Sequence, residues 1–486
     1  DRIMVIQGAA GSGKTSIALH RIAYLLYHDR KNLKSSSVLV LSPNGVFSDY
    51  ISHILPELGE ENIREMSFDL FAYKRLKNVV SDCEDRYDLI ERQIAGLCDE
   101  KLLKEKLSRD FLDRMEGYLV ELEDSLMNFR DVEHRGVVKK EQEIIELFYF
   151  KFMDIPLLSR MDAVAEYFID EVETLKGFDL PDEEREAVKS RFYRMYETRD
   201  LYVLYNRFLR QEGFSSLPQV QYEKRKLRYE DVYPVLYLKY RLETQQEDSG
   251  VRHLIVDEMQ DYSMIQYLII QRLFKCRMTI LGDREQTMDG EQQDVLTFLP
   301  KIFGKDIRRI VMNKSYRNTV EIASYANKLA GITEVELFER HGKPVVEKEF
   351  PGLEEALESV VRELRLEKQA VIAENADEGV EDIISYETAA VIARTADEAR
   401  ETYYILKEKL EAEGFDTKER LSLLHRDSTN FQKGLTVTTF YMAKGLEFDQ
   451  VFSVFPGEDR SPIVERARYI AATRALHELY MYEVVK

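Results

Sequence analysis

Apolar residues along this chain gather in short continuous runs, separated by longer stretches in which they recur at helical spacing. Strands of parallel sheets read as continuous apolar runs because helices cover both of their faces. Runs of this kind occupy residues 3–8, 37–43, 253–258, 278–283, 307–312, 389–395, 435–440 and 449–455. After the first run, residues 14–28 carry apolar positions at a helical period. The pattern predicts an α/β fold with parallel sheets in two cores.

Residues 79–227 interrupt this pattern with long polar and apolar alternation at a helical period. We therefore expect a first core at 1–78 and 228–300, a helical insertion at 79–227, and a second core at 301–486. Residues 81–220 contain 33 acidic and 21 basic side chains, a net charge of −12. That charge fits either a solvated helical bundle or an anionic docking surface.

Composition and charge limit the number of domains, the contacts with nucleic acid and the location that we expect for the protein. The 486 residues are 44% hydrophobic, which is enough for two or three compact domains. The formal net charge is −20, so most of the surface repels a phosphate backbone and any nucleic-acid contact must be local. No apolar run reaches the roughly 18–20 residues needed to span a bilayer, and the first residues predict a strand rather than a signal peptide. We expect a cytoplasmic monomer that does not bind a membrane.

The segment GAAGSGKT, between the first predicted strand and its helix, matches the phosphate-binding pattern G-x-x-x-x-G-K-[ST]. Glycines let backbone N–H groups turn toward phosphate oxygens, and the helix N-terminus adds positive potential. In such a loop Lys14 reaches the β and γ phosphates, and Thr15 ligates magnesium. The predicted nucleotide contacts are Gly8, Ala9, Ala10, Gly11, Ser12, Gly13, Lys14, Thr15 and Ser16. The expected cofactors are ATP and Mg²⁺.

A pair of adjacent carboxylates follows another predicted strand, in the segment HLIVDEMQD. Asp257 is placed to hold magnesium, and Glu258 to orient and deprotonate an attacking water. The alternative for both residues is a solvated loop after a strand. Beside a phosphate-binding loop, the acid pair favours hydrolysis of the nucleotide.

Six motifs occur in order along the chain: GAAGSGKT, VDEMQD, ILGDREQ, NKSYRNT, AKGLEF and YIAATRA. Together they resemble the UvrD/Rep-type superfamily 1 helicase motors, whose fold is two RecA-like P-loop NTPase domains with parallel sheets. The resemblance covers both predicted cores. It implies that ATP is hydrolysed at the interface between them.

The resemblance also implies a role for each matching residue. Gln286 would sense the γ-phosphate, Tyr316 would stack on the base, and Glu447 would accept a hydrogen bond from the ribose. Arg317 and Arg474 would be arginine fingers that neutralise charge on the transferred phosphoryl group. The nucleotide contacts implied in the second core are Tyr316, Arg317, Gly445, Glu447 and Arg474. From the residues alone, Arg474 could also be an ordinary cation at a helix end.

The sequence departs from the DNA-unwinding members after the sensor glutamine, where those proteins carry aromatic residues that stack on single-stranded DNA. Here the stretch reads TMDGEQQ, with Asp289 and Glu291 at the aromatic positions, and the chain contains no tryptophan. A base stack contributes about 1–3 kcal/mol, whereas a carboxylate repels the neighbouring phosphates. Only about 120 residues separate SYRNT from AKGLEF, too few for the large domain that such helicases insert there. Both departures argue against strand unwinding.

Within the superfamily, GAAGSGKTSIALHRIAYLLY, LRYEDVYPVLYLKYRLE and FYMAKGLEFDQV look like the HelD-type, helicase-IV-like proteins. That group binds RNA polymerase and uses ATP to release it from nucleic acid. The resemblance implies an upstream coiled-coil arm, which is absent from the sequence as given. The acidic insertion would suit the positively charged channels in which RNA polymerase holds DNA.

Two alternatives stay open beside an ATPase that acts on RNA polymerase. One is a 3′ to 5′ translocase or helicase that acts on single-stranded DNA. The other is a nucleotide-binding switch with negligible turnover. Glu258 and the two arginines argue against the switch, because binding alone requires neither a general base nor arginine fingers.

Overall fold

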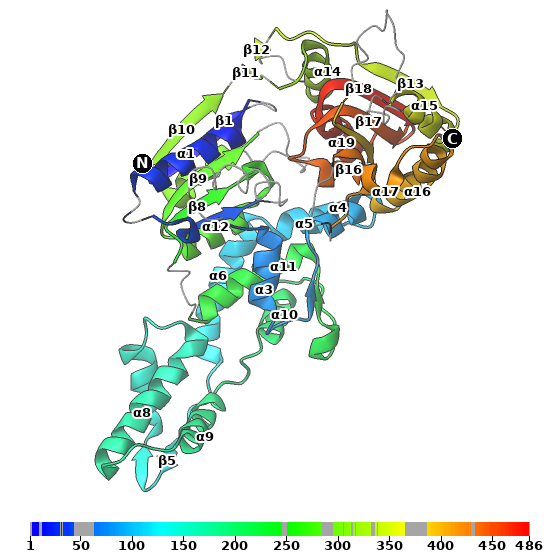
Figure 1. Cartoon of the computed structure of the whole chain (residues 1–486). Coiled ribbons are helices and arrows are strands. Elements are labelled where there is room, and N and C mark those ends of the chain that lie inside the picture. Colours follow the sequence, from blue (N-terminus) through cyan, green and yellow to red (C-terminus); the bar gives the residue numbers. More distant parts are fainter. Residues whose placement is uncertain are drawn as a thin grey trace, which may run out of the picture.

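The structure is a computed structural model (Figure 1). The residues that it describes are 2–8, 12–29, 31, 33–42, 63–244, 250–283, 295–304, 306–312, 314–315, 317–331, 336–337, 339–364, 386–426, 428 and 433–485.

The first core is a six-stranded parallel sheet with the strand order β10-β1-β9-β8-β2-β3. Its strands are β1 (Ile3–Gly8), β2 (Val38–Leu41), β3 (Arg64–Met66), β8 (His253–Val256), β9 (Arg277–Gly282) and β10 (Ile307–Met312). The helices that pack around it are α1 (Lys14–His28), α3 (Phe68–Leu76), α11 (Tyr229–Leu242), α12 (Met264–Leu273) and α13 (Val295–Phe303). All the strands are parallel, so every connection between them must cross over the sheet.

Alternate residues of β1 explain how both faces of the first sheet are covered. Met4 and Ile6 belong to a buried cluster with α1, whereas Ile3 and Val5 belong to a cluster that includes α3, α11 and α12. Successive side chains of a strand point to opposite faces, so an entirely apolar strand needs a cover on each side. The prediction from the continuous apolar runs is confirmed for this core.

The second core is a separate six-stranded parallel sheet with the strand order β13-β18-β17-β14-β16-β15. Its strands are β13 (Val346–Phe350), β14 (Thr388–Ala393), β15 (Leu421–Leu423), β16 (Gly434–Thr439), β17 (Phe448–Pro456) and β18 (Ala475–Val484). Its helices are α14 (Val320–Ala330), α15 (Leu353–Glu363), α16 (Ala396–Ala412), α17 (Thr417–Arg420), α18 (Phe440–Ala443) and α19 (Pro462–Ala472). Two short strands, β11 (Lys314–Ser315) and β12 (Glu336–Leu337), pair outside it. Two parallel sheets confirm the predicted fold class.

The predicted boundary between the cores at residue 300 needs a correction. β10 pairs with β1 over its whole length, with Ile3 opposite Ile307 and Gly8 opposite Met312. The first core therefore continues at least to Met312. The sequence pattern located this strand correctly, but the residues of a strand at a sheet edge do not indicate which sheet it pairs with.

The insertion starts and ends at a short parallel pair, β4 (Asp82–Cys83) with β7 (Lys226–Leu227), close to the predicted limits of 79 and 227. Its helices are α4 (Arg86–Ile94), α5 (Glu100–Lys106), α6 (Arg109–Ser125), α7 (Glu141–Glu146), α8 (Arg160–Lys176), α9 (Asp182–Tyr193) and α10 (Leu201–Gln211). A hairpin of β5 (Val132–His134) and β6 (Val137–Lys139) turns through Arg135 and Gly136, both with positive φ, as in a type I′ turn. The lobe with α8, α9 and β5 extends away from both sheets (Figure 1).

One helix of the insertion, α4, packs against the second core, whereas the lobe with α8 and α9 extends away from it. In Figure 1, α4 lies close to elements of the second core. Ile90 of α4 is buried in the cluster formed by α14, α19 and the second sheet. Tyr87 of α4 also contacts that core, because its ring centroid lies 5.4 Å from that of Tyr441 in α18. The sequence predicted a helical insertion but not this contact.

Candidate nucleotide-binding site

Three neighbouring strands of the first sheet bring the predicted phosphate loop and the acid pair to one edge. β1, β9 and β8 are parallel, so their carboxyl ends open on the same side. β1 ends at Gly8, where the phosphate-binding motif starts, and β8 is followed by Asp257 and Glu258. β9 is followed by the buried Asp283. Ligands of open α/β sheets bind at such carboxyl edges.

Glycines are required at this edge because backbone and side chains approach closely. A Cβ on Gly8 would lie 2.3 Å from the Ser12 Oγ, and a Cβ on Gly282 would lie 2.8 Å from the backbone nitrogen of Met259. Gly13, the residue before α1, has a φ of 81°, in the left-handed region. The tight turn of the motif therefore cannot hold a larger residue at 8 or 13 without strain.

Lys14, the first residue of α1, points back across the loop. Its Nζ donates to the Gly8 carbonyl at 2.7 Å. Burial lowers the pKa of Lys14, while the charges of Asp283 and Glu258 oppose that effect, and Arg317 adds to it. Carboxylates of the first core and a cation of the second core thus both act on this ammonium group.

Asp257 and Glu258 form a partly buried acid pair whose pKa values shift in opposite directions. Burial, followed by the charge of Glu258, raises the pKa of Asp257 well above its usual range. Burial alone would also raise the pKa of Glu258, but Lys444, Lys14 and Arg474 outweigh it and lower that pKa. Glu258 is therefore held ionised and able to accept a proton.

The backbone at Glu258 is held in an uncommon conformation. Its φ is 51°, and among the described non-glycine residues only Arg135 shares a positive φ. The Gln260 side chain donates to the Glu258 carboxylate and accepts from the Asp283 backbone N–H at 3.0 Å. Strain of this kind persists where the surroundings impose it, and it is common at active sites.

The second core contributes two arginines to the same region. Arg474 is buried after α19 and donates to the carbonyl of Leu446 and to the Thr473 hydroxyl, at 3.2 and 3.0 Å. Burial and then Arg317 lower the pKa of Arg474, while Glu258 opposes them. Arg317 forms an ion pair with Glu447 at 2.5 Å. Cations from both cores, Lys14 of the first and Lys444 and Arg474 of the second, therefore lower the pKa of Glu258.

Lys444 and Asp261 are site residues that the sequence reasoning missed. Lys444, from the AKGLEF motif, donates to both carboxylate oxygens of Asp261 at 2.9 and 2.8 Å. The same Nζ lies 3.7 Å from the Glu258 carboxylate. Both residues stand inside the quoted motifs, VDEMQD and AKGLEF, and each is a buried charge. Their place in the motifs was the signal that the sequence offered, whereas their burial, which makes each charge require a partner, appears only in the structure.

Five of the predicted residues lie close enough for their charges to shift one another's pKa values: Lys14, Asp257, Glu258, Arg317 and Arg474. Ser12 is buried beside Gly8, Ser16 lies in the first turn of α1, and Gly445 is exposed with a φ of 89°. Other predicted residues lie outside the described part of the chain: Ala9, Ala10, Gly11, Gln286, Tyr316 and the side chain of Thr15.

The donor set at this edge fits a magnesium ion. Asp257 is a partly buried carboxylate beside a second carboxylate, whose charge raises its pKa, and a divalent cation relieves this repulsion. Among the described residues, no group of three or more His, Cys, Asp or Glu side chains could hold a metal alone. Magnesium at nucleotide sites needs fewer protein ligands, because phosphates and water complete its shell. Asp257 and Thr15 remain the predicted ligands.

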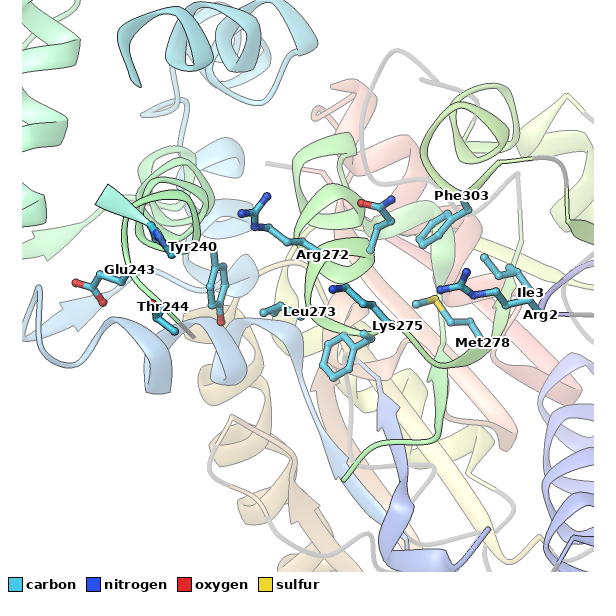
Figure 2. A pocket seen from close by; sticks show the side chains of 13 residues that line it. Arg2, Ile3, Tyr240, Glu243, Thr244, Arg272, Leu273, Lys275, Met278 and Phe303 are labelled. Atoms are coloured by element: carbon cyan, nitrogen blue, oxygen red, sulfur yellow. The ribbon is translucent and has the colours of Figure 1, made fainter. Parts of the chain in front are cut away.

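A cavity of about 570 Å³ lies elsewhere, among residues shown in Figure 2. Its walls include Arg2 and Ile3 at the start of β1, Met278 at the start of β9, and Tyr240 and Glu243 at the end of α11. These strand ends face away from the edge that holds Gly8 and the acid pair. None of the predicted nucleotide residues lines it, so it is not part of the candidate site.

Comparison with known proteins decides the family. A family model for the UvrD/REP helicase N-terminal domain matches residues 1–288, more than half of the chain. The chain belongs to the UvrD/REP helicase family. Membership of the UvrD/REP helicase family implies an ATP-hydrolysing, helicase-like enzyme, so the predicted resemblance is confirmed at the family level.

Two further comparisons add little. The C-terminal domain of a possible DNA helicase from Lactobacillus plantarum WCFS1 is 23% identical, with a TM-score of 0.25, over 35% of this chain and 88% of that one. No curated protein matches the chain. Within the described residues, no helix combines the length and apolar character that a membrane crossing requires.

Proposed function

We propose that this chain hydrolyses ATP at a site shared by its two cores. One observation carries the proposal: the carboxylate of Glu258 in the first core lies 3.7 Å from the Nζ of Lys444 in the second core, and the charges of Lys444, Lys14 and Arg474 lower its pKa. A general base influenced by both cores makes hydrolysis sensitive to how the cores lie against each other. Closure around the nucleotide and opening after hydrolysis would then be the working cycle.

Each charged group has a defined task in this proposal. Lys14 binds the β and γ phosphates, and Asp257 with Thr15 holds the cation that neutralises them. Glu258 orients a water molecule and accepts its proton. Arg317 and Arg474 stabilise the negative charge that develops on the transferred group. Gln286 and Tyr316 are proposed as γ-phosphate sensor and base stack, and Gly445 and Glu447 as further nucleotide contacts.

Glu258→Gln tests the proposal most simply. The amide cannot accept the proton, so phosphate release should fall at least 100-fold while Mg²⁺-ATP binding stays within a few-fold of the unaltered protein. Glu243→Gln, at the end of α11, removes a carboxylate outside the site and serves as the control. Unchanged phosphate release by Glu258→Gln would exclude this residue as the base.

For the partner, we propose that the motor acts on RNA polymerase bound to nucleic acid, as its HelD-like segments suggest. The net charge of −12 over residues 81–220 supports this proposal, because an anionic surface suits a channel that normally holds DNA. The lobe with α8 and α9 extends into solvent, where such a channel could receive it (Figure 1).

Charge reversal tests the polymerase proposal. Asp182 and Glu183 are exposed acids in the first turn of α9, and changing both to Lys should weaken binding to core polymerase at least 10-fold. Glu354 and Glu355 are likewise exposed acids in the first turn of a helix, α15 of the second core, so Glu354→Lys with Glu355→Lys is the matched control. Equal losses in both variants would point to general charge effects and not to a docking lobe.

A DNA translocase is the second candidate, and the family match favours it. Its ATPase rate should rise many-fold with single-stranded oligonucleotide and fall steeply as salt increases, because phosphate contacts release counterions. A rate that oligonucleotides leave flat, but that core polymerase raises, would favour the first candidate.

A further inference from the structure

Asp261 is the point at which all three parts of the molecule meet. It lies in the short helix η5 (Met259–Asp261), directly after the acid pair of the first core. From the second core, Lys444 donates to both of its carboxylate oxygens. From the insertion, Arg86 pairs with the Asp261 carboxylate at 2.9 Å and also donates to its backbone carbonyl. One carboxylate thus joins the first core, the second core and the insertion.

Burial makes these contacts obligatory in this arrangement. The side chains of Asp261 and Lys444 are 1% and 3% exposed, and that of Arg86 is 16% exposed. Two cations therefore share one buried carboxylate. The second carboxylate that balances them is Glu258, 3.7 Å from the Lys444 Nζ. A buried charge that loses its partner is strongly unfavourable, so movement of Lys444 affects Asp261 and Glu258 together.

Arg86 extends this connection because it is the first residue of α4, which is fixed to the second core along its length. Glu91 accepts hydrogen bonds from the Tyr441 hydroxyl and from the Ala396 backbone N–H. Asp88 accepts from Arg426 at 2.9 Å. Tyr441 belongs to α18, the helix that immediately precedes Lys444. The second core therefore reaches Asp261 directly through Lys444 and indirectly through α4.

The other side of α4 is tied to the insertion and to α11. Arg92 pairs with Glu230 of α11 at 2.6 Å and with Glu84 at 3.0 Å. Arg86 also contacts the first core through its backbone: its N–H donates to the carboxylate of Asp69 in α3 at 3.1 Å. A change in the angle between the cores must therefore either break contacts of α4 or move that helix.

From this geometry we propose that Lys444 is a positioning residue for Glu258. We also propose that Asp261 and Arg86 couple the nucleotide state of the site to the position of α4. The inference rests on the proposed ATPase and deepens it. With the cores together, Lys444 is anchored by Asp261 and presents its charge to Glu258. When the cores separate, Lys444 leaves both carboxylates, and Arg86 becomes the remaining cation on Asp261. The insertion then responds to the nucleotide through α4.

The first experiment compares Lys444→Met with Lys444→Arg. The methionine keeps most of the side-chain volume but removes the charge, so kcat for ATP should fall at least 10-fold while the Kd for Mg²⁺-ATP changes less than threefold. Arginine restores a cation and should recover at least a third of the kcat. Lys106→Met is the matched control, because Lys106 of the insertion forms another buried pair away from the candidate site, with Asp231 of α11 at 2.6 Å.

The outcomes separate this inference from the proposed function. A loss of kcat in Lys444→Met that Lys106→Met does not share, with recovery in Lys444→Arg, supports the positioning role. Equal losses in the two methionine variants, or no recovery by arginine, overturn it. If the unaltered protein hydrolyses no ATP, the proposed function itself fails.

The second experiment follows the link to α4 by hydrogen exchange of the full chain, with and without a non-hydrolysable ATP analogue and Mg²⁺. In the unaltered protein, the analogue should slow exchange in both α1 and α4. In Arg86→Met, protection of α1 should remain while the change in α4 falls to less than half. Undiminished protection of α4 in Arg86→Met would overturn the link. No protection of α1 in either protein would instead count against nucleotide binding.

Discussion

At the scale of single residues, the candidate site depends on charges that are buried and shared between domains. The motif pattern predicted Lys14, Asp257, Glu258, Arg317 and Arg474, because each has a residue type that phosphoryl chemistry requires. It did not single out Lys444 or Asp261, whose importance lies in burial and in their mutual contact. Burial of a particular lysine follows from packing, and packing is not visible in a motif.

Gly282→Ala should destabilise the first core, because its Cβ would lie 2.4 Å from the Met259 Cγ and 2.8 Å from the Met259 nitrogen. The backbone atom cannot move away cheaply, so we expect a loss of about 1–3 kcal/mol in the free energy of unfolding. Chemical denaturation measures it. Gly117→Ala in α6 is the control, since beyond the backbone of its own helix a Cβ there would meet nothing within 4 Å, and alanine should stabilise that helix slightly. Equal stability of the two variants would show that the close approach is not real.

At the scale of elements, α4 shows both what the sequence pattern predicts and where it stops. Asp85 caps the helix, and its capping box with Asp88 is a local signal that a sequence carries. The side of α4 that faces the second core is set by the distant residues Ile90 meets there. Helical periodicity predicts that an apolar face exists but not which partner covers it.

The two acids at the start of α4 should respond to pH with opposite signs, although both contact Arg426. Burial raises the pKa of Asp85 from 3.8 to about 6, so the folded state binds its proton more tightly than the unfolded state does. Ionisation of Asp85 therefore costs stability as pH rises from about 4 to above 6. Asp85→Asn keeps a capping side chain and should gain about 1–2 kcal/mol relative to the unaltered protein between pH 4 and pH 7.5.

Asp88 gives the opposite sign. Burial alone would raise the pKa of Asp88, but hydrogen bonds from Arg426 and from the Asp85 N–H lower it below 3.8. Its contribution to stability is present above its unfolded pKa and is lost as pH falls through the lower folded value. Asp88→Asn should therefore destabilise the protein at pH 7.5 and lose that effect in acid. Thermal unfolding of both variants across pH checks the pair, and parallel pH profiles would contradict these signs.

At the scale of the whole molecule, one buried cluster joins the first sheet to the insertion. It runs from Val5 of β1 through Phe71 and Tyr233 to Phe111 of α6 and Phe168 of α8. The continuous apolar runs and the helical insertion were predictable from periodicity. The membership of β10 in the first sheet was not, because strand order depends on contacts between segments about 300 residues apart.

The shared cluster predicts that the first core and the insertion unfold together. Phe111 is fully buried and packs edge-on against Phe208 and Phe214, so Phe111→Ala should cost about 3–5 kcal/mol. Native-state hydrogen exchange should show faster opening in β1 and α11 as well as in α6, with β14 and β17 of the second core much less affected. Acceleration confined to the insertion would contradict a common core.

The central claim is that one nucleotide is hydrolysed by groups from both cores, and Arg474 tests it most directly. It comes from the second core, yet its charge is among those that lower the pKa of Glu258 in the first. Arg474→Ala should reduce kcat for ATP at least 1,000-fold, as expected for an arginine finger, while Mg²⁺-ATP binding persists within about 10-fold. Steady-state phosphate release measured beside equilibrium binding gives the answer. A variant that still folds, binds ATP and hydrolyses it at the original rate would contradict a shared site.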